Sequence, residues 1–206
     1  MSHHDLPLKN ADYGTQVYWN TRYTASQEPH DWFATFADIA RFLIPHLTSS
    51  SRILHLGCGT SKLSQDLYDA GYKHICNVDY SDAVITAMRD KYQHQEEVTW
   101  HCADITQLPF HDACFDVALD KGTLDALLCE PNADPWSPSP AILERVNAEL
   151  DQVVRVLKPR GVFVYVTFGQ AHFRKPLLER PGVWDVSVST IGDTFHYFVY
   201  ICKKIV

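Results

Sequence analysis

The stretch Arg52-Ile-Leu-His-Leu-Gly-Cys-Gly-Thr-Ser61 decides the fold, because an apolar run leads directly into a glycine turn. Residues 52–56 have the length of a strand that is buried on both faces of a parallel sheet. Gly57 and Gly59 allow a turn whose free backbone N–H groups lie at the carboxyl edge of that sheet, where its ligands bind. A Cβ atom at either position would block a ligand from approaching the backbone. Many tight turns share Gly-x-Gly, so a simple turn remains open.

Outward from this stretch, short β-branched runs alternate with segments of helical period. Such alternation predicts an α/β fold, a doubly wound, mainly parallel sheet with helices on both faces. Five strands are expected at 52–56, 74–78, 98–102, 115–119 and 162–167.

Three connecting helices follow from capping and spacing signals. Ser61 and Ser81 are expected to cap the helices after the first and second strands, and Gly71 to end the first of these. A longer helix is predicted over about 141–157, where apolar residues recur at helical spacing until Lys158-Pro-Arg-Gly161 ends it.

Both ends of the chain differ from this alternation. Residues 184–188 and 195–201 read as two strands joined by a turn at Gly192-Asp193, too short for a crossover helix. The last strand is therefore predicted to be antiparallel, in a sheet of seven strands. Residues 1–47, an aromatic segment followed by a helix that ends near Pro45, are expected to cover part of a single domain over 1–206.

Composition narrows the class of protein. The 206 residues are 46% hydrophobic and 21% charged, as in a soluble globular chain, and a monomer is expected. A net charge of −7 without a basic run argues against nucleic acid as the direct substrate and favours a basic protein or a small molecule. With no membrane span or secretory signal, a cytoplasmic location is expected. The six cysteines lack C-x-x-C spacing, so we expect reduced thiols and no metal site.

Two acidic residues strengthen the interpretation of the glycine turn as a ligand site. Asp79 ends the second predicted strand 22 residues after Gly57, the position from which a carboxylate binds both ribose hydroxyls. Asp104 follows the third strand, where it could accept the exocyclic amine of adenine while Ile105 and Tyr80 pack against the ring. A lone aspartate is more often a helix cap or a solvated charge. Acids at successive strand ends favour an adenosine-type ligand.

The choice between a nicotinamide dinucleotide and S-adenosylmethionine depends on the phosphate signature. A dinucleotide requires a third glycine, and Lys62 stands at that position. The chain also lacks a second domain to hold a hydride acceptor. S-adenosylmethionine carries no phosphate and is therefore favoured.

The chain resembles the class I, seven-stranded S-adenosylmethionine-dependent methyltransferases. Within them it is similar to the small eukaryotic lysine methyltransferases that modify elongation factor 1-alpha. The run Lys121-Gly-Thr-Leu-Asp125 is its most specific feature. The other segments that carry the resemblance are Tyr18-Trp19-Asn-Thr-Arg-Tyr23, Asp31-Trp32-Phe33, Leu56-Gly57-Cys58-Gly59-Thr-Ser61, Val78-Asp79-Tyr80-Ser81 and Asp134-Pro135-Trp136.

The resemblance implies a set of contacts to S-adenosylmethionine, which would be the cofactor. In sequence order these are Trp19, Tyr23, Trp32, Gly57, Asp79, Tyr80, Asp104, Ile105 and Lys121. The three aromatic residues of the N-terminal segment would form a lid, with ordinary packing as the alternative. Two positions depart from the general pattern of the class, His55 before the first glycine and Ser61 after the second, and His55 is expected to be a packed residue.

The implied reaction is methylation of a lysine in a protein substrate, with elongation factor 1-alpha as the candidate partner. Asp120, at the end of the fourth strand, is predicted to orient the acceptor amine as the catalytic residue, or else to cap the next turn. The proline-rich loop 130–140 is the expected recognition surface. A small-molecule methyltransferase and a cofactor-binding module without turnover remain the alternative functions.

Overall fold

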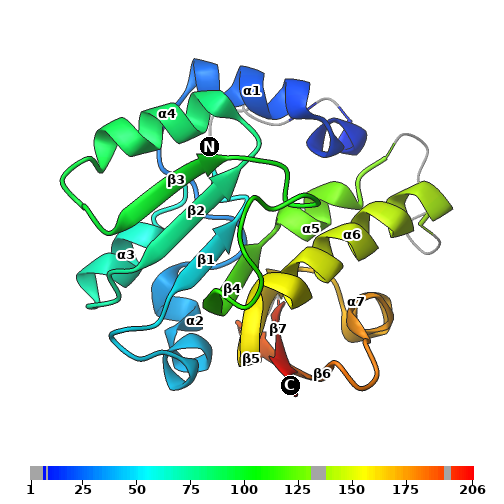
Figure 1. The fold of residues 1–206 in the computed structure, drawn as a ribbon. Helices are drawn as coiled ribbons and strands as arrows, with labels where there is room; N and C mark the ends of the chain where they lie inside the picture. Colours follow the sequence, from blue (N-terminus) through cyan, green and yellow to red (C-terminus); the bar gives the residue numbers. More distant parts are fainter. Residues whose placement is uncertain (1–6, 8, 131–137, 193–195) are drawn as a thin grey trace.

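The computed structural model describes residues 7, 9–130, 138–192 and 196–206, which form the sheet and helices of Figure 1. Seven strands of these residues pair in the order β3-β2-β1-β4-β5-β7-β6. Only β7 runs antiparallel to its two neighbours, while the other pairs are parallel. The predicted fold class is therefore confirmed. The strands are β1 Ile53–Leu56, β2 Ile75–Asp79, β3 Val98–Cys102, β4 Phe115–Lys121, β5 Leu157–Thr167, β6 Trp184–Ile191 and β7 Tyr197–Lys204.

Helices cover both faces of this sheet. The α-helices are α1 Gln16–Ala25, α2 Phe36–Leu43, α3 Leu63–Asp69, α4 Asp82–Lys91, α5 Thr123–Leu127, α6 Pro140–Val156 and α7 Ala171–Leu178, with 3-10 turns η1 Asn10–Gly14 and η2 Ile44–His46. In Figure 1, α5, α6 and α7 lie on one side of the sheet and α2 and α3 on the other, with α1 and α4 near β3.

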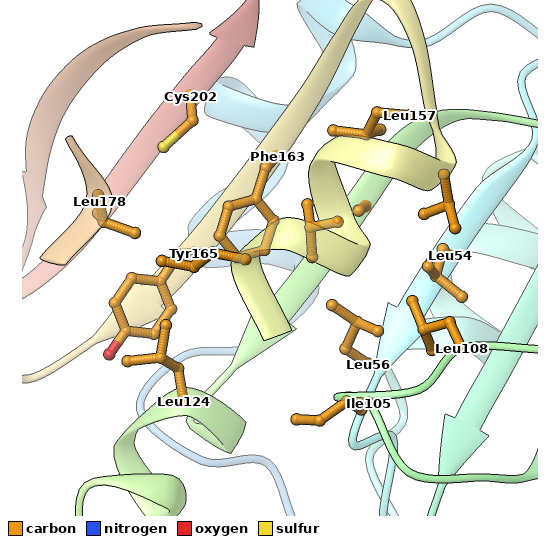
Figure 2. Close-up of a cluster of buried hydrophobic side chains, with 14 of the residues drawn as sticks. Leu54, Leu56, Ile105, Leu108, Leu124, Leu157, Phe163, Tyr165, Leu178 and Cys202 are labelled. Carbon is orange, nitrogen blue, oxygen red and sulfur yellow. The ribbon is translucent and has the colours of Figure 1, made fainter. Parts of the chain in front are cut away.

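Alternating side chains of each strand divide the core into two halves. Ile53 of β1 packs with apolar residues of α2, α3 and α4, whereas Leu54 and Leu56 pack with those of α6. Figure 2 shows Leu54 and Leu56 in the cluster on the α6 side of the sheet, together with Phe163 and Tyr165 of β5. Because both faces are buried, β1 is apolar at most positions rather than alternating with polar residues, as the sequence indicated.

Helix α6 confirms the strongest helix prediction to within one residue at each end. Ser139 caps it, because its side-chain oxygen accepts a hydrogen bond from the N–H of Ile142. Val146 and Leu150 lie on the apolar face that packs on the sheet. One polar residue shares that face, because Glu149 is fully buried.

The two predicted serine caps have different outcomes. Ser81 stands at the N-cap of α4, but its side chain makes no capping bond and its hydroxyl is buried without a partner among the described residues. Lys62 takes the N-cap position of α3, one residue later than predicted, yet the Ser61 oxygen accepts the N–H of Leu63, the first residue of this helix, at 3.1 Å. The Ser61 hydroxyl also donates a hydrogen bond to Asp31.

The ends of the chain follow the predicted arrangement with shifted bounds. The N-terminal helix before Pro45 is α2, which ends at Leu43 and continues as η2. The hairpin of β6 and β7 is present, although Asp193 of the predicted turn and the first expected residue of the last strand, Phe195, lie outside the described residues. Helix α1 and the short helices α5 and α7 were not predicted. All six cysteines are free thiols, and no helix in the described ranges is long and apolar enough to cross a membrane.

Candidate active site

A cavity of about 190 Å³ opens at the carboxyl edge of the sheet, where loops after β1 to β5 meet the N-terminal segment. Nine of the ten predicted site residues line it, namely Trp19, Tyr23, Trp32, Gly57, Asp79, Tyr80, Asp104, Ile105 and Lys121. The tenth, Asp120, is not among its lining residues. The structure thus brings together side chains that are spread over about half of the chain.

The glycine turn packs so closely against neighbouring side chains that a Cβ atom fits at neither Gly57 nor Gly59. Gly57 and Gly59 both have positive φ, +57° and +47°, a conformation that favours glycine. A Cβ atom at Gly57 would collide with the side chain of Thr123, and one at Gly59 would lie 2.6 Å from the hydroxyl of Tyr23. The turn is therefore packed against the N-terminal helix and the start of α5, with its backbone on the cavity.

Asp79 ends β2 with its carboxylate inside the cavity wall. One oxygen accepts the N–H of Gly59 and the other accepts the N–H of Ser81, each at 3.0 Å. The residue is 4% exposed, and burial raises the pKa of its carboxyl to about 6 against the opposing effect of these N–H groups. At neutral pH the ionised group still has acceptor capacity for a ligand that donates hydroxyl hydrogens.

Asp104 combines a local and a cavity role. One carboxylate oxygen accepts the N–H and the hydroxyl of Thr106, both at 2.8 Å, which closes a turn after β3. The side chain nevertheless lines the cavity beside the buried Ile105. Asp104 therefore closes a turn, instead of capping a helix, and still lines the cavity.

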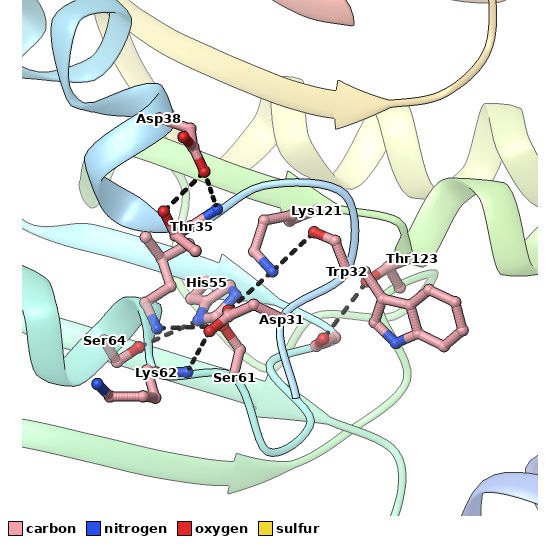
Figure 3. A network of polar contacts seen from close by, with 12 residues as sticks. Asp31, Trp32, Thr35, Asp38, His55, Ser61, Lys62, Ser64, Lys121 and Thr123 are labelled. Carbon is pink, nitrogen blue, oxygen red and sulfur yellow. Dashed lines mark hydrogen bonds and ion pairs between the residues drawn. The ribbon is translucent and has the colours of Figure 1, made fainter. Parts of the chain in front are cut away.

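An ion pair joins the N-terminal segment to the sheet edge. Lys121 Nζ donates to Asp31 Oδ1 at 3.0 Å and to the carbonyl of Trp32 at 3.2 Å, as Figure 3 shows. Asp31 also accepts the Ser61 hydroxyl and, at 3.4 Å, the N–H of Lys62. We call this Asp31–Lys121 contact the latch, because it holds residues before α2 against the glycine turn.

Burial and charge act in opposite directions on the latch. Burial raises the pKa of Asp31, but the Lys121 ammonium and the Ser61 hydroxyl outweigh it, so the pKa falls below its usual value. Burial lowers the pKa of Lys121, and the Asp31 carboxylate offsets part of that change. Sequence reasoning quoted Asp31 only within a motif and assigned it no role.

The backbone next to the latch is strained. Phe33 has a φ of +65°, which is rare for a bulky residue, and the N–H of Ala34 donates to the carbonyl of Trp32 at 2.7 Å across it. A Cβ atom at Gly122, whose φ is +92°, would lie 3.0 Å from the Phe33 ring. The segment therefore crosses close over the end of β4, in a conformation that tertiary contacts must maintain.

The aromatic residues of the N-terminal segment pack against one another along the cavity. Trp19 stacks on Tyr23 at 5.7 Å and meets Trp32 edge-on at 6.1 Å between ring centroids. The indole N–H of Trp19 donates to the carbonyl of Tyr13 at 2.7 Å. Packing and cavity lining therefore occur together in these residues. Whether the segment moves as a lid stays a prediction.

Asp120 takes the capping alternative. Its two oxygens accept the N–H groups of Thr123 and Leu124, each at 2.9 Å, and the residue is 1% exposed. The prediction that it orients the acceptor finds no support in this geometry, because the first N–H groups of α5 need the nearest acceptor. Burial raises its pKa to about 7, and the pKa of Glu149 is raised by burial and by the Asp120 carboxylate.

His55 is a packed residue, in line with the expectation for it. Its Nδ1 lies 3.0 Å from Ser64 Oγ and 3.2 Å from Asn77 Oδ1. Burial lowers its pKa to about 4, so the ring is neutral at physiological pH. Figure 3 shows it near Asp31, on the side toward Ser64.

Asp125 lines the cavity, and sequence reasoning missed it as a site residue. Its carboxylate accepts hydrogen bonds from the hydroxyls of Tyr165 and Thr167 at 2.9 and 2.7 Å, and from Arg174 at 2.7 Å. These partners lie 40 to 49 residues further along the chain. Only the run Lys121-Gly-Thr-Leu-Asp125 marked the residue in advance. Within the described ranges no cluster of histidine, cysteine and acidic residues could hold a metal ion.

Comparison with known proteins identifies the family to which the chain belongs. Residues 54–165 match the methyltransferase domain family. The chain is 39% identical to EEF1A lysine methyltransferase 4 of Mus musculus, over 97% of this chain and 79% of that protein. It is 31% identical to the eEF1A lysine and N-terminal methyltransferase of Homo sapiens, over 92% of this chain but only 27% of that protein.

Solved structures confirm the fold. A SAM-dependent methyltransferase from Methanosarcina mazei has a TM-score of 0.60 at 20% identity and covers 80% of this chain and 97% of its own. A 1,6-didemethyltoxoflavin-N1-methyltransferase of Burkholderia thailandensis with bound S-adenosylhomocysteine has a TM-score of 0.57 at 15% identity, over 81% of this chain and 76% of its own. The chain therefore belongs to the S-adenosylmethionine-dependent methyltransferases, in the group that includes the EEF1A lysine methyltransferases.

Proposed function

We propose that this enzyme transfers methyl groups from S-adenosylmethionine to a lysine of elongation factor 1-alpha. One observation carries the proposal. A chain 39% identical to an EEF1A lysine methyltransferase over 97% of its length lines a single cavity with all nine residues expected to contact the cofactor. The name of the relative indicates the protein that accepts the methyl group, and the cavity is where the methyl transfer would take place.

The residues of the cavity fit S-adenosylmethionine. Asp79 offers a buried carboxylate for the ribose hydroxyls, and Gly57 and Gly59 line the cavity where the methionine part would lie. Tyr80 and Ile105 provide faces for adenine, with Asp104 beside them. The aromatic wall of the N-terminal segment suits a sulfonium ion, which is attracted to ring faces. The Lys121 ammonium is bound to Asp31 and to the Trp32 carbonyl in the latch. We therefore assign Lys121 the role of holding this aromatic wall in place.

The protein's part in the reaction is alignment and exclusion of water. S-adenosylmethionine supplies an electrophilic methyl group, and its displacement needs an acceptor in line with the breaking bond. A lysine amine has a reference pKa of about 10.4 and must lose its proton before it attacks. An aromatic, partly buried cavity favours the neutral amine, because burial disfavours the ammonium form.

The partner expected from charge is basic. The chain carries a net charge of −7, which would attract a basic protein surface over a distance set by ionic strength. The predicted recognition loop falls largely on residues 131–137, outside the described residues. A monomeric enzyme that acts in the cytoplasm remains part of the proposal.

Methylation assays with labelled cofactor test the proposal directly. Elongation factor 1-alpha from cells that lack the enzyme is incubated with the full chain, and methylated residues are mapped by mass spectrometry. We expect a single lysine to gain methyl groups, and its change to arginine to abolish labelling. Methyl groups only on a free metabolite would favour the small-molecule methyltransferase, and cofactor binding without any transfer would favour the binding module.

A further inference from the structure

The cavity has two ends, which lie at different strands of the sheet. Asp104 and Asp79 follow β3 and β2, at one side of the sheet, and are the residues that fit adenosine. Asp125 lies in α5 after β4 and bonds to Tyr165 and Thr167 of β5, beyond β1 and β4 on the other side. Asp125 therefore lies at the end of the cavity away from the adenosine residues.

The Asp125 carboxylate retains acceptor capacity at this end. Oδ1 accepts hydrogen bonds from Thr167 and Arg174, whereas Oδ2 accepts one, from Tyr165, among the described residues. A carboxylate oxygen has two lone pairs, so Oδ2 can accept one more donor. The residue lines the cavity although it is only 7% exposed.

Arg174 changes what this carboxylate does to a bound amine. An isolated carboxylate would stabilise a lysine ammonium and oppose the loss of its proton. The guanidinium of Arg174, 12% exposed in its side chain and 2.7 Å from Asp125, balances that charge. The pair offers a hydrogen-bond acceptor without net charge, which suits a neutral amine.

Aromatic side chains border the same end. Phe168 follows β5 and is 51% exposed, with the Arg174 guanidinium 5.8 Å from its ring centroid. The ring centroids of Phe33 and Phe168 are 5.6 Å apart, and both residues line the cavity. Apolar ring faces at an opening fit the methylene chain of a lysine whose amine points inward.

Resting on the proposed function, we propose that Asp125, balanced by Arg174, binds the acceptor lysine amine and that Phe33 and Phe168 hold its methylene chain. The site replaces the one predicted at Asp120. Asp125 would accept one N–H of the neutral amine and so orient its lone pair along the cavity toward the glycine turn. Arg174, which acts through Asp125, is a positioning residue.

Steady-state kinetics of Asp125→Asn on the protein substrate test this inference. We expect kcat/KM for the protein substrate to fall at least tenfold, while the dissociation constant of S-adenosylhomocysteine stays within twofold of wild type. The matched control is Asp112→Asn, which also removes an aspartate paired with an arginine, Arg155 at 2.8 Å, but on the exposed surface. It is expected to leave both quantities unchanged.

A second variant covers the possibility that Asp125→Asn does not fold. Phe168→Ala alters an exposed side chain and is expected to raise KM for the protein substrate several-fold with little change in kcat or in S-adenosylhomocysteine affinity. The inference is overturned if Asp125→Asn weakens S-adenosylhomocysteine as much as it lowers kcat/KM, or if the folded variants keep wild-type kinetics. Failure of the wild-type enzyme to methylate any lysine would instead refute the proposed function.

Discussion

The two ends of the cavity hold their carboxylates in different ways. At the β2 and β3 end, Asp79 is bound by backbone N–H groups of Gly59 and Ser81. Next to the β4 and β5 end, Asp31, which is not among the lining residues, is bound by the Lys121 ammonium, 90 residues away in sequence, and the lining residue Asp125 is bound by the Arg174 guanidinium, 49 residues away. The first end depends on the local path of the chain, and the second depends on contacts between distant segments.

This difference explains opposite electrostatic behaviour in residues of the same type. Burial raises the pKa of Asp79 to about 6, because backbone N–H groups only partly offset it. In Asp31 the Lys121 ammonium, the Ser61 hydroxyl and the Lys62 N–H together outweigh the effect of burial, and the pKa falls. A formal cation and hydroxyl donors beside a buried carboxylate thus reverse the shift that backbone N–H groups alone do not reverse in Asp79. The first end should respond to pH near neutrality, and the second to removal of its cations.

The largest effect is expected from Asp79→Ala. Loss of a charge-assisted, two-point contact to the ribose should weaken S-adenosylhomocysteine by about 2 to 3 kcal/mol, roughly a hundredfold. Calorimetric titration measures the affinity, with Asp82→Ala on the exposed first turn of α4 as the control. An unchanged dissociation constant in a folded variant would remove the ribose assignment.

A smaller effect is expected from acid. Because the pKa of Asp79 is raised to about 6, the carboxylate takes up a proton as the pH falls through that value. At pH 5 about one tenth of it is ionised, so S-adenosylhomocysteine affinity should be about tenfold lower than at pH 7.5. The same titration in Asp79→Asn should show no such loss, and an equal loss there would assign it to another group.

Removal of the latch cation should act on mobility more than on affinity. Lys121→Met leaves Asp31 without its cation, so amide exchange over residues 13–35 should quicken and S-adenosylhomocysteine affinity should fall about fivefold. The matched control, Lys62→Met, removes an exposed lysine 3.9 Å from Asp66. Exchange rates equal to wild type would show that aromatic packing alone holds the segment.

The wild-type protein tests the lid with the same measurement. If the aromatic segment closes over the cofactor, S-adenosylhomocysteine should slow amide exchange over residues 13–35. Equal exchange with and without ligand would make the segment a constant part of the core.

The smallest effect concerns Asp120 and Glu149 beneath the second end. Burial raises the pKa of Asp120 to about 7 and also raises that of Glu149, so their protonated forms stabilise the fold at low pH, and the contribution of Asp120 is lost as the pH rises through about 7. Glu149→Gln removes one titrating group, so its free energy of unfolding should fall less with rising pH than that of the wild-type protein. If the free energies of unfolding of the two proteins change in parallel with pH, the raised pKa of Glu149 is contradicted.

The first end of the cavity was predictable because its geometry follows from strand ends. In a parallel sheet, residues that end successive strands meet at one edge, so the spacing of Gly57, Asp79 and Asp104 was sufficient to place them together. The long periodic helix α6 was equally clear, since its apolar residues recur over four turns. Nothing in this pattern predicted that Glu149, in the middle of the apolar face, would be buried.

By itself, then, the sequence determined the sheet, the helices α2, α3, α4 and α6 and the β2 and β3 end of the cavity, because periodicity and strand-end spacing are local properties of the chain. The tertiary structure decided which carboxylates face the cavity. Asp120 turns to the N–H groups at the start of α5, whereas Asp125 lines the cavity and pairs with Arg174 from a distant segment. Asp31 is not among the lining residues and pairs with Lys121, likewise from a distant segment. Such pairings depend on how helices and loops pack across the sheet edge, and no short spacing in the sequence encodes them.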